Sequence, residues 1–90
     1  MSAVFIQHRV ADFDTWKPLF DADHARRVET GLKDARVFRL DGDENMLLVA
    51  FQTDDLSSFA KMMADPELAA AMKEAGVISE PEVWIGEPAG

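Results

Sequence analysis

Val4-Phe5-Ile6-Gln7-His8-Arg9-Val10 is the stretch that decides the fold, and it leads directly into an amphipathic segment over Phe13–Val28. Alternate residues of a strand share one face, which here carries Val4, Ile6, His8 and Val10. The second segment repeats large side chains at helical spacing, namely Phe13, Trp16, Phe20, His24 and Val28. We therefore predict a strand over Ala3–Val10 followed by one long helix, bent or started late at Pro18.

The rest of the sequence predicts three further strands and a second helical segment. Further strands are expected over Ala35–Leu40, Met46–Gln52 and Glu82–Glu87. Gly31 supplies a left-handed stop for the first helix. A second helix begins at Asp54-Asp55 and restarts at Asp65-Pro66-Glu67, where the proline suits a first helical position. The order is βαββαβ, which predicts an α+β, ferredoxin-like fold with a four-stranded antiparallel sheet and its helices on one face.

The other face of this sheet is also predicted to be apolar. The third predicted strand, Met46-Leu47-Leu48-Val49-Ala50-Phe51, is apolar on both sides, and Phe5 and Phe38 add to the face that helices cannot reach. A half-solvated antiparallel sheet alternates apolar with polar residues instead. Because soluble monomers rarely expose such a surface, we predict a homodimer that closes through the sheet face.

Composition places limits on location and partners. The 90 residues are expected to form one domain over residues 1–90, and the net charge of −8 opposes binding to nucleic acid or to anionic membranes. The absence of cysteine favours a cytoplasmic location, and the sequence shows neither a secretory signal nor an apolar run of the ~20 residues that span a bilayer. Most basic residues lie within residues 9–39. They could form a positive pocket mouth for an anionic ligand or ordinary surface ion pairs, and the sequence does not decide between these two alternatives.

Two motifs resemble a known superfamily. His8-Arg9-Val10 leads into Asp14-Thr15-Trp16-Lys17-Pro18, and Asp65-Pro66-Glu67-Leu68 ends at Ala75-Gly76-Val77. With the element order from Val4 to about Glu87, they resemble the dimeric α/β-barrel superfamily, which includes antibiotic-biosynthesis-monooxygenase-like proteins and stress-responsive barrel proteins. The resemblance implies the ferredoxin-like fold and a homodimer.

The activities of this superfamily imply particular pocket residues. Cofactor-free quinone-forming monooxygenases use asparagine, tryptophan and often tyrosine to bind and deprotonate a phenol that then reacts with oxygen. This sequence has no tyrosine, and Asn45 lies in a predicted hairpin turn. Haem-degrading members carry asparagine, tryptophan and histidine where this chain has His8, Met62 and Met72. A thioether ligates iron weakly, so we expect no haem and no other cofactor.

His8 is the best catalytic candidate, because an imidazole with a pKa near ~6.5 suits proton abstraction. A hydrogen-bonded core histidine is the competing interpretation. His24 is expected at the surface, and no ligand-spacing motif supports a metal site. Arg39 could reach a ligand carboxylate or pair with Asp41. The candidate pocket residues are His8, Trp16, Phe20, His24, Arg39, Phe59, Met63 and Met72.

Two functions follow from these residues. The first is a small dimeric barrel protein that binds a small apolar or aromatic ligand between sheet and helices, in an accessory or stress-related role. The alternative is a cofactor-independent monooxygenase-, isomerase- or cyclase-like enzyme on a phenolic or polyketide-like substrate, with His8 as the proton-transfer group. The absence of the polar groups of the known chemistries favours the first, and an occluded His8 with no adjoining cavity would exclude the second.

Overall fold

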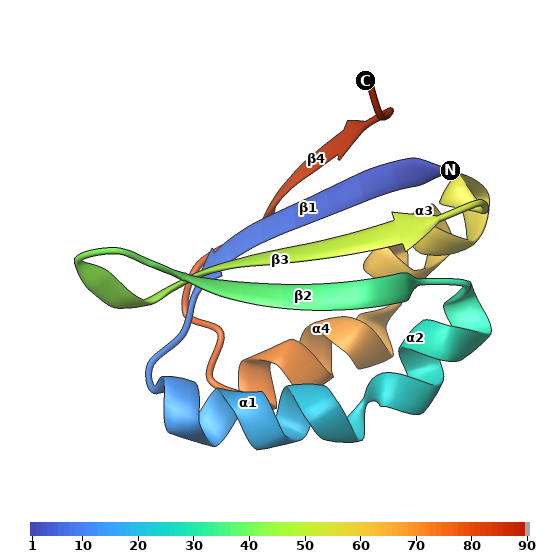
Figure 1. Ribbon diagram of the computed structural model, residues 1–90. Coiled ribbons are helices and arrows are strands. Elements are labelled where there is room, and N and C mark those ends of the chain that lie inside the picture. Colours follow the sequence, from blue (N-terminus) through green and yellow to red (C-terminus); the bar gives the residue numbers. More distant parts are fainter. Residues whose placement is uncertain (90) are drawn as a thin grey trace.

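The computed structural model describes residues 1–89 and arranges them as a sheet covered on one side by helices (Figure 1). In chain order the elements are β1 (Ser2–Arg9), α1 (Phe13–Ala22), α2 (His24–Thr30), β2 (Lys33–Leu40), β3 (Asp43–Thr53), α3 (Leu56–Ala64), α4 (Pro66–Glu74) and β4 (Glu82–Gly86). The strand order is β2-β3-β1-β4, and every pair is antiparallel. The predicted ferredoxin-like fold is confirmed.

The core lies between the helices and one face of β1 and β3. Residues alternate along β1, so that Val4, Ile6 and His8 point towards the helices while Phe5, Gln7 and Arg9 point away. Against them pack buried side chains from β3 and the helices: Leu47, Val49, Phe51, Trp16 and Phe59. The predicted placement of His8 on the helix side is therefore correct.

The long first helix predicted over Phe13–Val28 is wrong, because the structure divides it into α1 and α2 at Asp23. Pro18 lies inside α1, and the helix continues through it. At Asp23 the backbone N–H bonds the carbonyls of Leu19 and Phe20 at 3.2 Å. Arg27 Nη1 also donates to the Phe20 carbonyl, at 2.7 Å, and this carbonyl is the one that the amide of His24 would need in a continuous helix.

The other predicted helix boundaries hold. Gly31 ends α2 in the left-handed conformation, with φ of 84°. Asp55 caps α3 by accepting from the amide of Ser58, and Asp65 caps α4 by accepting from the amide of Glu67. The strands differ by up to three residues from prediction at their ends. A register shift interrupts β2 between Lys33 and Arg36, around a left-handed Asp34.

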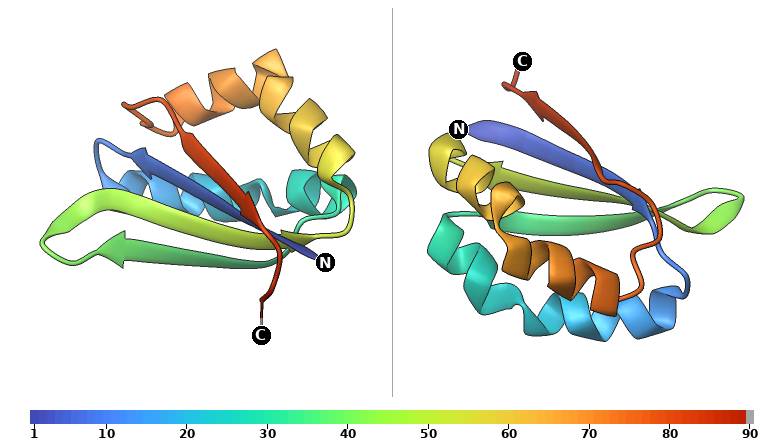
Figure 2. Two further views of the ribbon diagram at one scale, coloured as in Figure 1. Left: turned by 90° about the horizontal axis from the view of Figure 1, so that it is seen from above. Right: turned by 180° about the vertical axis from the view of Figure 1, so that it is seen from behind.

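The face of the sheet opposite the helices carries the apolar side chains that the sequence predicts there, together with polar ones such as Gln7 and Arg9. Phe5 lies between Ala50 and Trp84 on neighbouring strands, and Phe38 lies beside Leu48. Phe38 and Trp84 are 43% and 47% exposed. The two further views show this face without a helix over it (Figure 2). Within residues 1–89 no helix has the length and apolar character needed to cross a membrane.

Candidate functional site

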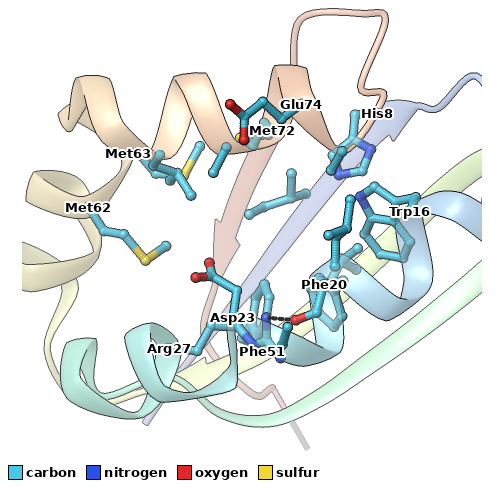
Figure 3. Close-up of a pocket in the computed structure, with 17 residues that line it drawn as sticks. His8, Trp16, Phe20, Asp23, Arg27, Phe51, Met62, Met63, Met72 and Glu74 are labelled. Carbon is cyan, nitrogen blue, oxygen red and sulfur yellow. Dashed lines mark hydrogen bonds between the residues drawn. The ribbon is translucent and has the colours of Figure 1, made fainter.

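A cavity of about 270 Å³ lies between the sheet and the helices (Figure 3). Pockets for small molecules range over ~300–1,000 Å³, so this cavity suits a ligand of one or two rings. Most of its lining is apolar, and four of its residues can ionise. The lining residues are Ile6, His8, Trp16, Leu19, Phe20, Ala22, Asp23, Arg27, Val49, Phe51, Met62, Met63, Leu68, Ala71, Met72, Glu74 and Ala75.

One wall of the cavity is a row of aromatic rings. His8 meets Trp16 edge to face, with ring centroids 5.7 Å apart. Trp16 stacks on Phe20 at 4.7 Å, and Phe20 lies 6.4 Å from Phe51. Such contacts fix ring orientation and stabilise each pair by about 0.5–1.5 kcal/mol beyond the burial of area. The row is therefore a rigid, flat surface for an apolar ligand.

Methionines from the two later helices form the facing wall. Met62 and Met63 come from α3 and Met72 from α4, and Figure 3 shows them across the cavity from the aromatic row. Methionine side chains are flexible and polarisable, so they adapt to the outline of a ligand. A rigid aromatic wall thus faces a deformable one.

His8 contributes the imidazole at one end of the cavity. The side chain is 5% exposed, and its Nδ1 is buried with no hydrogen-bond partner among residues 1–89. Burial lowers the pKa of His8, because the imidazolium is poorly solvated there, and a contact with its own backbone raises the pKa by less. The ring is therefore neutral at pH 7, which is the form required of a proton acceptor.

Arg27 contributes a buried cation, which the sequence analysis did not select. The side chain is 8% exposed, donates to the Phe20 carbonyl and lies over the Phe20 ring at 3.8 Å. Burial lowers the pKa of Arg27, and the charges of Asp23 and Asp21 raise it by less. A signal existed in the sequence, because Arg27 follows Phe20 by seven residues, a helical spacing.

Five of the predicted pocket residues lie together at the cavity, and three lie elsewhere. Those at the cavity are His8, Trp16, Phe20, Met63 and Met72. His24 is exposed, because α2 restarts after Asp23 and turns it outward. Phe59 is buried within the core. Arg39 lies over the Phe13 ring at 4.2 Å and pairs with Glu44 rather than with Asp41.

The described part of the chain contains no cluster of side chains that could hold a metal ion. Among residues 1–89, no three histidine, aspartate or glutamate side chains gather as a metal site requires. The residues at the cavity that can ionise are His8, Asp23, Arg27 and Glu74. The arrangement suits hydrogen bonding and proton transfer to an organic ligand.

No protein-family model matches the sequence, and no curated protein matches it. Solved structures do match in fold. An antibiotic biosynthesis monooxygenase has 14% identity and a TM-score of 0.71, with all of both chains covered. SnoaB, a cofactor-independent oxygenase from Streptomyces nogalater, has 14% identity and a TM-score of 0.72 over 99% of this chain and 94% of its own.

A monooxygenase of Streptomyces coelicolor, solved in complex with nanaomycin D, has 16% identity and a TM-score of 0.62 over 99% of this chain and 88% of its own. At these identities the likeness concerns the fold. The chain adopts the antibiotic-biosynthesis-monooxygenase-like fold, and the fold that the sequence resemblance implies is confirmed.

The lowered pKa of His8 predicts a pH-dependent stability. Below the ordinary value of 6.5 the unfolded chain binds a proton at His8 before the folded chain does, so the free energy of unfolding falls as the pH drops. The contribution is fully present above pH 6.5 and is lost as the pH falls towards the folded pKa. We expect His8→Gln to lose less stability than the wild type between about pH 7.5 and about pH 5.

Chemical denaturation at the two pH values measures this difference. His24→Gln is the matched control, since it removes the exposed histidine, and it should keep the wild-type loss. Equal losses in the wild type and His8→Gln would contradict the argument from burial.

Proposed function

We propose that this protein binds a small apolar or aromatic ligand in the cavity between sheet and helices, in an accessory or stress-related role. The observation that carries the proposal is the cavity itself, with a rigid aromatic wall, an adaptable methionine wall and few polar groups. Sites for small molecules have this composition, with a small number of placed polar groups for orientation. No cofactor is required, and the proposed location is the cytoplasm.

A solved structure of the same fold supports the proposal. The Streptomyces coelicolor monooxygenase was solved with nanaomycin D, so this architecture accommodates an organic ligand in a chain of similar length. The cavity of the present chain differs in its own residues, and these set what it binds. His8 and Arg27 are the two buried ionisable groups at the cavity among residues 1–89.

Filling the cavity tests the proposal. Ala71 on α4 lines the cavity, whereas Ala70 on the same helix is exposed. We expect Ala71→Leu to weaken binding of 2-naphthol by at least about tenfold, because the larger side chain occupies ligand volume. Isothermal titration calorimetry measures the affinity.

Ala70→Leu is the matched control, and it should bind 2-naphthol as the wild type does. Alanine and leucine are both good helix formers, so the control makes the same change in helix propensity. Equal affinity of Ala71→Leu and Ala70→Leu for 2-naphthol would mean that the ligand binds outside the cavity. Absence of 2-naphthol binding to the wild type would argue against an aromatic ligand.

A homodimer through the open face of the sheet is the second part of the proposal. The residues that carry it are two cross-strand pairs, Phe38 with Leu48 and Phe5 with Trp84, and Leu48 and Phe5 are diagonal neighbours on β3 and β1. Exposed apolar side chains in one contiguous group favour association, because burial removes their surface from water. A twofold partner on this face leaves the cavity, on the other side of the sheet, unobstructed.

Light scattering after gel filtration tests the dimer. The wild type should elute with twice the chain mass of 10.0 kDa, and Phe38→Lys should shift it to the mass of one chain at micromolar concentration. Val28→Lys is the control, because Val28 is an exposed apolar residue on α2 rather than on the sheet. A wild-type monomer, or dissociation by Val28→Lys alone, would contradict an interface on the open face.

The neutral, buried His8 at the cavity favours a second function, a cofactor-independent oxygenase-, isomerase- or cyclase-like activity in which His8 accepts a proton from a phenolic or polyketide-like substrate. SnoaB, of the same fold, is a cofactor-independent oxygenase. We expect oxygen consumption with a phenolic substrate to fall by about 10²–10⁴-fold in His8→Gln, the range of general-base catalysis. His24→Gln should react as the wild type does. Activity unchanged in His8→Gln would remove this second function.

A further inference from the structure

Arg27 is a buried guanidinium that forms no ion pair with a carboxylate among residues 1–89. Desolvating an ion is costly unless opposite charges and hydrogen bonds compensate it. The Phe20 ring and the Phe20 carbonyl supply part of this compensation. Both are uncharged, and the charges of Asp23 and Asp21 raise the pKa of Arg27 by less than burial lowers it.

The nearest carboxylates are held by other cations. Asp21 pairs with Lys17 at 2.7 Å, and Asp23 pairs with Arg26 at 3.1 Å. Arg27 itself forms no ion pair with any carboxylate among residues 1–89. Arg36 is the other arginine without an ion pair to a carboxylate among residues 1–89, and it is exposed, so water solvates it. Arg27 therefore combines burial with a charge that is only partly compensated.

The Arg27 guanidinium has one donor edge that no group among residues 1–89 uses. Nη1 is engaged by the Phe20 carbonyl, and Nε is buried with no hydrogen-bond partner in the described part of the chain. The edge formed by Nε and Nη2 matches a carboxylate, which accepts two parallel hydrogen bonds from such a pair. Arg27 lines the cavity, and because its Nε is buried, a carboxylate reaches this edge with a small movement of the side chain.

We infer that Arg27 binds the carboxylate of an apolar monocarboxylic acid, which rests on the cavity being the ligand site proposed above. The aromatic row and the methionines hold the apolar body of the acid. His8 lies towards the other end of the cavity in Figure 3, where it can hydrogen-bond a second polar group of the ligand. Asp23 also lines the cavity, but its charge is compensated by Arg26.

Acids and their neutral isosteres separate this inference from general apolar binding. 2-Naphthoic acid and 2-naphthamide have the same skeleton and nearly the same volume, but only the acid is an anion at neutral pH. We expect the wild type to bind the acid about ten- to hundredfold more tightly than the amide, the range of charge-assisted hydrogen bonds. Isothermal titration calorimetry measures both affinities, and thermal unfolding checks that each variant is folded.

Arg27→Gln should reduce the affinity for the acid to that for the amide and leave the amide unaffected. Arg36→Gln is the matched control, because it removes one arginine charge on the opposite face of the sheet, and it should keep the preference. Equal affinities of the wild type for acid and amide overturn the inference while the cavity function stands, whether or not Arg27→Gln folds. If neither compound binds the wild type, both the inference and the aromatic-ligand proposal fail.

Discussion

The pairing of β1 with both β3 and β4 is the constraint on which the molecule depends. β1 is one of the two inner strands of the sheet, and its alternation sets which of its residues face the helices and which face the opposite side. A shift of one residue would exchange the two sets, placing Phe5 in the core and His8 on the open face. The helix layer, the cavity and the apolar outer face all follow from this one register.

The contact between Arg27 and Phe20 joins the fold to the site. Arg27 donates to the Phe20 carbonyl, which the amide of His24 would use in a continuous helix, at the point where the chain turns at Asp23 and α2 begins. The same contact holds the guanidinium over the Phe20 ring, next to the stacked Trp16. One side chain therefore lies at the break between two helices, packs on the aromatic wall and carries a charge to the cavity.

The sequence predicts the fold well because its signals are local and periodic. The alternation of Val4, Ile6 and His8, and the caps Asp55 and Asp65, depend on nearby residues alone. The break at Asp23 could not be predicted, since it depends on a side chain seven residues beyond Phe20. The residues that line the cavity were harder still to predict. Met63 and Met72 line it, but Arg39 does not and instead pairs with Glu44. Arg27 was missed because a charged residue on a helix is usually solvated.

The irregularity of β2 governs how sheets of different molecules can meet. An outer strand offers a row of backbone donors and acceptors to any extended chain, and proteins commonly interrupt that row with bulges and charges to prevent fibrous growth. Here the left-handed Asp34 and the register shift between Lys33 and Arg36 break the row. Lateral addition of strands at this margin is disfavoured, so the sheet is protected against amyloid-like extension while its broad face stays free for a partner.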